Sequence, residues 1–305
     1  MRDLSVEIPF NIEHIFYPTD LSPPSMTAFA HALKLSLSLG ADLTIMHMDP
    51  QHADLDFENF PRVRATLTNW GILPQAATKE DVLQLGFNVR KILAMPEDPV
   101  ASVAQLLWRK PVDLMVLATH ENDDLMHWLH HPMAETMSRK SRIMTLFVPS
   151  TSSGFISLDM GACWLRRVLI PIDHRPHPQV TIEAACMMAD AVGAHDVSFE
   201  LLHVGSDKNP PSVITPWRHG WTWSRSFASG IVVDEILTAA TQHPADLIVM
   251  ATELRHGFLD ALRGSTTERV LRQTPCPLLS VPADELPSGL HRSEKITNRW
   301  LPARH

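Results

Sequence analysis

A glycine and two hydroxyl side chains, Gly264, Ser265 and Thr266, stand directly before a segment with helical periodicity. Free backbone N–H groups at the start of a helix bind phosphate when no side chain blocks its approach. The same residues fit a capping box, in which Ser265 caps the helix and Glu268 bonds back to the cap. Capping leaves other N–H groups of the first turn free. The sequence therefore predicts a capped helix, either alone or with an anion-binding site at its start.

The corresponding stretch lies 133 positions earlier and lacks these features. His131 and Pro132 occupy the places of Gly264 and Ser265. Proline has no N–H to donate, and the histidine adds bulk. Acidic residues between positions 121 and 124 would also repel a polyphosphate. If an anionic ligand binds, it is therefore expected in the later copy and not in the earlier one.

These positions belong to a pattern of strands and helices that occurs twice. The segment 111–120 (PVDLMVLATH) matches 244–253 (PADLIVMATE). Near the start of the second copy, Pro171, Asp173 and Gly193 stand 153 positions after an identical set in the first. The smaller offset of 133 later in the copies means that the first copy holds about 20 extra residues in its middle.

Strands alternate with helices in each copy, and the strands are almost entirely apolar. Such strands are typical of a parallel sheet covered by helices on both faces. We therefore predict an α/β protein with two doubly wound, mainly parallel-sheet domains in tandem, both Rossmann-like. The domains are expected over residues 1–150 and 165–283, joined by a Ser/Gly-containing linker, with a polar tail at 284–305.

Composition limits the classes of function. The chain has 305 residues and a net charge of −8, and it has no apolar run of about 18 residues that could cross a membrane. Neither half has the basic face that nucleic-acid binding needs. Acidic residues in MRDLSVEIPF occupy the place of the basic and apolar regions of a signal peptide, so a cytoplasmic protein is expected. Three scattered cysteines predict neither a disulfide framework nor a thiolate zinc site.

A histidine-rich stretch, HENDDLMHWLHH, is the candidate metal site. His127, His130 and His131 have the i, i+3, i+4 spacing that places side chains on one helical face, where they could hold zinc. A polar helix face exposed to solvent explains the same pattern without a metal. The chain has no nucleophile elbow, Walker glycine-lysine motif or paired catalytic carboxylates. A binding or regulatory module is favoured over an enzyme; the alternative is a slow nucleotide hydrolase or a metal-dependent activity using the His120 to His131 cluster.

Aromatic and histidine side chains near the second strand of each copy have structural interpretations. Trp217, Trp221 and Trp223 fall in a proline-containing segment that is interpreted as a loop. Their rings are expected to pack against the neighbouring domain, with stacking on an adenine as the alternative. His47 and His203 end the second strands and are predicted to be structural.

The repeated motifs resemble those of the universal stress protein family, arranged as two family domains in one chain. The resemblance rests on YPTDLS and IPIDHR after the first strands, DLMVLATH and DLIVMATE at the fourth, and GSTTERVLRQTPCPLLSV at the end. It implies an adenine-nucleotide-binding-like α/β fold, in a family where some members bind ATP and others do not. Because single-domain members pair with a twin, it also implies that the two halves pack face to face as an internal pseudo-dimer. Whether the fused chain forms a homodimer as well is left open.

Family members that bind ATP carry Gly, two residues, Gly, nine residues, and then Gly with Ser or Thr. In the second copy only the last two of these four positions match, and they hold Ala251, Leu254, Gly264 and Ser265. In the first copy none matches, and they hold Ala118, Glu121, His131 and Pro132. The resemblance therefore implies weak binding of ATP, or of a smaller ligand such as AMP, in the second copy. The expected contact residues are Pro171, Asp173, Ala251, Thr252, Gly264, Ser265 and Thr266.

Asp20 and Asp173 follow the first strand of each copy. The family uses a carboxylate at this position near the ribose and the adenine. An aspartate in such a loop also structures the loop itself through an Asx turn. The sequence leaves both roles open for the two residues.

Overall fold

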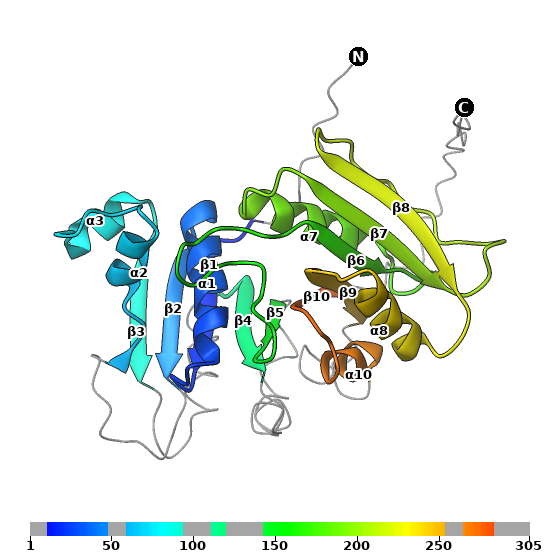
Figure 1. Ribbon diagram of the computed structural model, residues 1–305, viewed down its shortest axis with the longest axis horizontal. Helices are drawn as coiled ribbons and strands as arrows, with labels where there is room; N and C mark the ends of the chain where they lie inside the picture. Colours follow the sequence, from blue (N-terminus) through cyan, green and yellow to red (C-terminus); the bar gives the residue numbers. More distant parts are fainter. Residues whose placement is uncertain (1–10, 48–58, 94–110, 120–142, 254–264, 284–305) are drawn as a thin grey trace.

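The computed structural model describes residues 11–47, 59–93, 111–119, 143–253 and 265–283. Within these residues ten strands form one sheet in the order β3-β2-β1-β4-β5-β10-β9-β6-β7-β8 (Figure 1). All neighbouring strands are parallel except β5 and β10, which are antiparallel. The predicted α/β fold with a mainly parallel sheet is confirmed.

The first five strands belong to the N-terminal half of the chain. The described elements there are β1 (His14–Thr19), α1 (Ser25–Leu39), β2 (Asp42–His47), α2 (Val63–Asn69), α3 (Lys79–Gln84), β3 (Val89–Leu93), β4 (Leu114–Thr119) and β5 (Met144–Pro149). Helices α2 and α3 lie between β2 and β3, where the sequence predicts extra residues.

The last five strands belong to the C-terminal half. The described elements there are β6 (Arg167–Pro171), α7 (Gln179–Ala191), β7 (Val197–Val204), β8 (Trp221–Ala228), α8 (Val232–Gln242), β9 (Leu247–Glu253), α10 (Thr266–Leu271) and β10 (Leu278–Ala283). The segment between β7 and β8 contains no helix, unlike its counterpart in the first half.

Alternate side chains of the strands point into two separate apolar cores. In β1, Ile15 and Tyr17 join a core that includes α1 and α7, whereas Phe16 joins a second core that includes α8 and α10. Helices therefore cover both faces of the sheet, as the apolar strands predict. All six residues of β1 are buried, which leaves no solvent-facing side on this strand.

The two halves meet at the edges of their sheets and do not stack face to face. Leu278 pairs with Phe147, and Leu279 with Leu146, in the antiparallel ladder between β10 and β5. The two halves have the same strand order when each is read inward from its outer edge. That order is β3-β2-β1-β4-β5 in the first half and β8-β7-β6-β9-β10 in the second. The expectation of face-to-face packing is therefore wrong in its geometry. Edge pairing satisfies the main-chain hydrogen-bonding groups of β5 and β10. Face-to-face packing would leave these two strand edges exposed.

One aspartate in each copy ties the first strand to the fourth. The carboxylate of Asp246 accepts hydrogen bonds from the N–H groups of Arg166 and Arg167, both 2.8 Å away. The carboxylate of Asp113 accepts in the same way from Glu13 and His14, both at 2.9 Å. This explains why the repeated PVDL and PADL motifs carry an aspartate just before a buried strand.

The segment predicted as a linker is docked on the first half. The side chain of Phe155 is fully buried, and its ring meets the His31 ring of α1 edge to face with centroids 4.4 Å apart. The indole N–H of Trp70, just after α2, donates to the carbonyl of Leu158 at 2.8 Å. The connection therefore contacts α1 and α2 as well as linking the two halves of the sheet.

Two of the three tryptophans lie in a strand, which corrects the loop interpretation. Trp221 and Trp223 belong to β8 and point the same way because side chains alternate along a strand. The Trp223 ring stacks on Phe199 of the neighbouring β7 with centroids 4.3 Å apart. Trp217 precedes the strand and is 82% exposed. Both strand tryptophans thus pack against Phe199 of the neighbouring strand in their own half of the chain.

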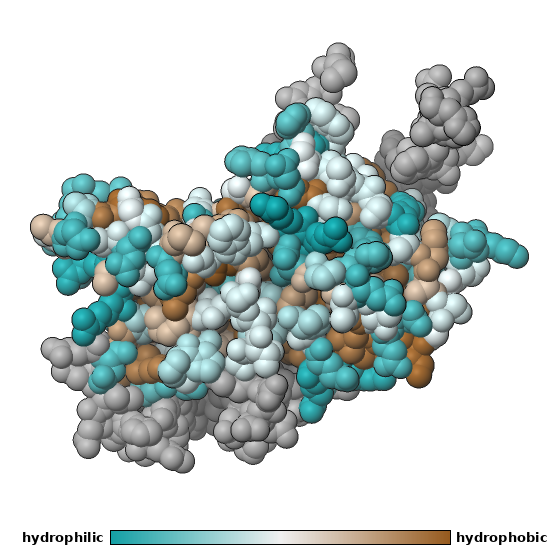
Figure 2. Space-filling view, in the orientation of Figure 1, coloured by the Kyte–Doolittle hydropathy of each residue, from teal (hydrophilic) through white to brown (hydrophobic). Residues whose placement is uncertain are grey.

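The surface mixes polar and apolar residues. Figure 2 shows hydrophilic side chains over much of the face that carries α7 and β8, with apolar ones emerging near α8. Ile231 and Val232, at the start of α8, are among the exposed large apolar residues. Among the described residues, no helix is long and apolar enough to span a membrane.

Candidate functional site

The two halves of the sheet each contain a point where the strand order reverses. In the second half, β6 has β7 on one side and β9 on the other. Strands β6 and β9 pair only at Val168 with Leu247 and at Leu169 with Ile248, whereas β9 and β10 pair along six residues. The two strands therefore separate toward their carboxyl ends. Ligands of open α/β sheets bind in the crevice at such a point.

The residues expected to contact a ligand follow these strand ends. Pro171 ends β6, and Asp173 lies exposed two residues later. Oδ1 of Asp173 accepts a hydrogen bond from the N–H of His174 at 2.7 Å, so the carboxylate does structure its own loop. Ala251 lies half-buried in β9.

Thr252 connects three elements beside the crevice. Its side chain is 3% exposed. The hydroxyl lies 2.8 Å from the hydroxyl of Ser280 in β10 and 3.2 Å from that of Thr267 in α10. This arrangement holds the first turn of α10 against the carboxyl end of β9, while the Thr252 hydroxyl itself faces protein partners.

Ser265 caps α10, as predicted. Its hydroxyl accepts a hydrogen bond from the N–H of Glu268 at 3.1 Å, and its φ of −73° and ψ of 162° place it outside the helix. The carboxylate of Glu268 accepts a hydrogen bond from Arg272 one turn further on, at 2.9 Å. Thr266 is the first residue of the helix and is exposed, and Gly264 lies outside the described residues.

The first half uses its equivalent loop differently. The hydroxyl of Tyr17 donates to the carbonyl of Ser25 at 2.7 Å, and the hydroxyl of Thr19 lies 3.0 Å from that of Ser25. Burial raises the pKa of Tyr17 to about 12, so the phenol stays neutral. The corresponding residues of the second half, Ile170, Ile172 and Pro178, carry no hydroxyl. The first-half loop is therefore closed by bonds among its own side chains.

The loop of Asp20 and the two strand-end histidines support the backbone. Oδ1 of Asp20 accepts from the N–H of Ser22 at 3.0 Å, which is an Asx turn. Nδ1 of His47 donates to the carbonyl of Thr19 at 3.2 Å, and Nδ1 of His203 donates to that of Ile172 at 3.1 Å. The structural role predicted for both histidines is confirmed.

The metal-ligating side chains and cysteine thiols in the described part of the chain provide no candidate metal site or reactive thiol. No group of three His, Cys, Asp or Glu side chains there is arranged to hold a metal ion. The stretch from His120 to His131, with Glu121 and Pro132, lies outside the described residues. Burial raises the pKa of Cys186 and of Cys276 to about 12, so neither thiol ionises readily.

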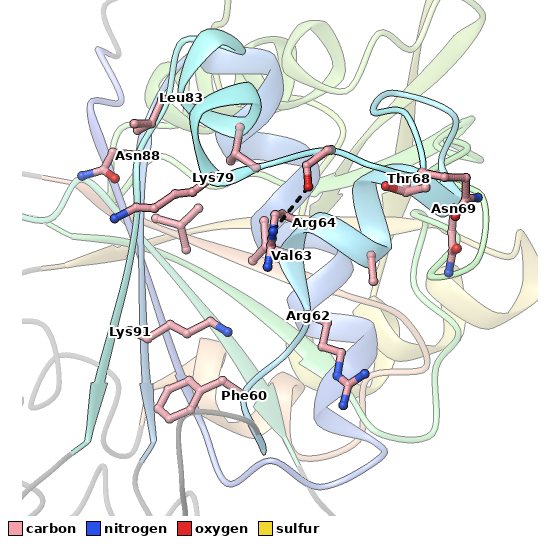
Figure 3. A pocket seen from close by; sticks show the side chains of 15 residues that line it. Phe60, Arg62, Val63, Arg64, Thr68, Asn69, Lys79, Leu83, Asn88 and Lys91 are labelled. Atoms are coloured by element: carbon pink, nitrogen blue, oxygen red, sulfur yellow. Dashed lines mark hydrogen bonds between the residues drawn. The ribbon is translucent and has the colours of Figure 1, made fainter.

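The first half also contains a pocket that the sequence did not predict. It has a volume of about 830 Å³ and lies between α2, α3 and β3 (Figure 3). Basic residues from separate elements line it, among them Arg64 and Lys91. The available signal was a run from 62 to 91 that is rich in Lys and Arg, but sequence alone does not place these side chains around one space.

Comparison with known families identifies the fold. The sequence profile described as the universal stress protein family matches residues 11–149 and 225–282. The chain belongs to the universal stress protein family. Membership assigns this protein to a family of stress-response proteins and agrees with the resemblance in the sequence motifs.

Solved structures extend the likeness over most of the chain. A universal stress protein from Archaeoglobus fulgidus DSM 4304 is 17% identical with a TM-score of 0.53, and the match covers 90% of this chain and 99% of that one. A functionally unknown protein from Pseudomonas aeruginosa PAO1 is 12% identical with a TM-score of 0.53, covering 89% of this chain and 93% of that one. No curated protein matches the chain. Identities this low establish a shared fold only, and nothing about a ligand follows from them.

Proposed function

We propose that this universal stress protein is a non-enzymatic binding module of the cytoplasm with two family domains, residues 1–150 and 165–283, followed by a polar tail at 284–305. In this proposal only the second domain binds an adenine nucleotide, and it binds ATP weakly or AMP in preference. The two domains act as an internal pseudo-dimer joined through β5 and β10. The nucleotide is a regulatory ligand and is not turned over.

The observation that carries the proposal is the contact of Thr252 with Thr267. It fixes the start of α10 beside the carboxyl end of β9, next to the place where β6 and β9 separate. The first N–H groups of a helix have no partner within the helix. In this proposal the N–H of Thr266, which is exposed, donates to a phosphate in this crevice, and the positive end of the helix dipole favours the same charge.

Asp173 supplies the other end of the proposed site. It is exposed at the carboxyl end of β6, on the other side of the crevice from α10. A carboxylate there can accept hydrogen bonds from ribose hydroxyls, as the family resemblance implies. In this proposal Ala251 in β9 and Pro171 in β6 contact the nucleotide between these two ends.

The first domain offers a poorer site for two reasons. Its position equivalent to Ser265 is Pro132, which has no N–H to donate. Its loop after β1 is closed by Tyr17, Thr19 and Ser25, which bond one another. Both features favour one nucleotide for each chain over two.

A substitution at Thr266 tests the proposed phosphate contact. Proline is common at the first position of a helix, and the extended backbone of Ser265 suits a residue before proline. Thr266→Pro should therefore keep α10 while removing one N–H. We expect it to weaken AMP binding about tenfold or more in calorimetric titrations, since a hydrogen bond to a charged group is worth about 1.5–3 kcal/mol.

Thr266→Ala is the matched control, because it removes the side chain and keeps the N–H. It should bind AMP within about twofold of the wild type, a difference of less than 1 kcal/mol. Equal AMP affinity in Thr266→Pro and Thr266→Ala would contradict the proposed contact.

A further inference from the structure

The pocket between α2, α3 and β3 carries a concentration of positive charge. Its basic lining residues are Arg62, Arg64, Lys79 and Lys91. Among the described residues that line it, none is acidic. Within the described part of the chain, none of the four forms an ion pair. This local excess contrasts with the net charge of −8 on the whole chain.

The acidic residues of α3 do not line the pocket. Asp81 in α3 accepts hydrogen bonds from the N–H of Thr78 at 2.7 Å and from its hydroxyl at 3.0 Å, which completes the helix cap. Glu80 is exposed and lies outside the lining. The Asp81 carboxylate therefore serves the helix start, and neither acidic residue of α3 lines the pocket beside the four cations.

Two of the cations are held in place by their surroundings. Nη1 of Arg64 donates to the carbonyl of Ala77 at 3.3 Å. Nζ of Lys91 lies 5.6 Å from the centre of the Phe60 ring, over its face. Figure 3 shows both head groups in the space between α2 and β3, with Arg62 and Lys79 to either side. The four cations thus border one volume; Lys91 is partly buried there, and Arg62, Arg64 and Lys79 are exposed.

The charges also oppose one another. Partial burial, and then the positive charges of Arg64 and Arg62, lower the pKa of Lys91. Bringing like charges together in a partly desolvated site costs free energy unless an anion is present. A bound anion would remove this cost and raise the pKa of Lys91 again.

The remaining lining residues fit an organic molecule better than a bare ion. Thr68, Asn69, Gln75 and Asn88 provide neutral hydrogen-bonding groups, and the apolar lining comes from Phe60, Val63, Ala65, Ala77, Val82, Leu83 and Val89. A volume of about 830 Å³ is in the range of small-molecule sites and far exceeds one phosphate ion. Arginine and lysine are the side chains that bind phosphate oxygens best.

We propose that this pocket binds a small organic molecule carrying more than one phosphate group. The site belongs to the helices inserted between β2 and β3, which the second half lacks, and it is separate from the nucleotide crevice. One chain then has two different ligand sites, one in each half.

The probe for the test is fructose 1,6-bisphosphate, which has two phosphates and no adenine. The variant is Arg64→Gln/Lys91→Gln, which removes two charges from the pocket and keeps polar side chains of similar length. The matched control is Arg166→Gln/Lys208→Gln, which removes two exposed charges from the second half. Calorimetric titration should show binding that the pocket variant weakens about tenfold or more and the control leaves within about twofold.

Three further measurements complete the test. Wild-type affinity should fall as ionic strength rises. The NMR-monitored pKa of Lys91 should rise when the bisphosphate is added. Thr266→Pro should retain bisphosphate binding, so failure of the nucleotide proposal and failure of this one are distinguishable. Equal weakening in the pocket variant and the control would overturn the proposal, and equal affinity for sulfate and the bisphosphate would indicate an adventitious ion only and overturn it too.

Discussion

Nε2 of His31 accepts a hydrogen bond from the backbone N–H of Phe155, 3.0 Å away. Nδ1 of the same ring donates to the carbonyl of Thr27 at 2.7 Å, so both nitrogens are used by the neutral imidazole. The ring is fully buried in α1. His31 therefore anchors the start of the connection between the two halves to α1, and its bond to Phe155 needs the unprotonated ring.

Acid should destabilise the protein through His31. Burial lowers the pKa of His31 from 6.5 to about 4 in the folded state. The stabilisation by the neutral ring is complete above pH 6.5 and is lost as the pH falls toward 4, because only the unfolded chain binds the proton in that interval. The loss should reach about 3 kcal/mol at most. Urea titrations followed by tryptophan fluorescence at pH 7 and 4.5 measure it.

His31→Gln provides the comparison, because glutamine offers a donor and an acceptor and does not titrate. It should be less stable than the wild type at pH 7, and the difference should shrink at pH 4.5. Parallel losses in the two proteins would show that His31 does not contribute to the acid sensitivity.

Gly154 cannot accept a side chain. Its φ is 66°, and an added Cβ would collide with the His31 ring. Gly193 has a similar φ of 68° with open space around it. Gly193→Ala should cost about 1 kcal/mol from backbone strain alone. Gly154→Ala should cost about 1–3 kcal/mol more from overpacking, and equal unfolding free energies for the two variants would refute this account.

Asp113 and Asp246 should be equally important for stability. Each accepts two backbone N–H bonds at the start of a buried strand. Alanine at either position leaves two donors unsatisfied and should cost about 1–3 kcal/mol. Chemical denaturation of the two variants measures the costs. If one variant loses much of its free energy of unfolding and the other loses none, the aspartate does not have the same structural role in the two copies.

Two hydroxyls at the junction between β5 and β10 should respond in opposite ways. The buried hydroxyl of Thr145 has no hydrogen-bond partner within the described residues, whereas the hydroxyl of Ser280, in the paired residue, bonds Thr252. Thr145→Val should stabilise the fold by about 1 kcal/mol, because it removes an unsatisfied polar group at nearly constant shape. Ser280→Ala should destabilise it by about 1 kcal/mol. Thermal unfolding of both variants measures the two changes in stability. A Thr145→Val variant that unfolds at a lower temperature than the wild type would contradict this prediction.

Local sequence patterns predicted the features that depend on neighbours along the chain. The run of apolar residues in 247–250 indicated a buried parallel strand, and the structure has β9 there. The helix ending at Gly40 is α1, with the glycine in the left-handed conformation that ends helices. The hydroxyl cap of Ser265 followed from its place before the helix.

Features that depend on contacts between distant residues were not predicted. The pairing of Phe147 with Leu278 joins segments far apart in sequence, and nothing in either segment distinguishes edge pairing from stacking. Trp221 and Trp223 follow a proline-rich stretch that obscured the alternation of a strand. The basic pocket exists because α2, α3 and β3 surround one volume, which no local pattern records.

The central claim is that an adenine nucleotide binds the second domain and not the first. Photolabelling with 8-azido-AMP, followed by peptide mapping, tests it most directly. The Arg64→Gln/Lys91→Gln background removes the basic pocket as a competing phosphate site. We predict that label displaced by excess AMP falls on peptides within residues 165–283 and is reduced by Thr266→Pro. AMP-displaceable label within residues 1–150, or label that AMP does not displace at all, would contradict the account.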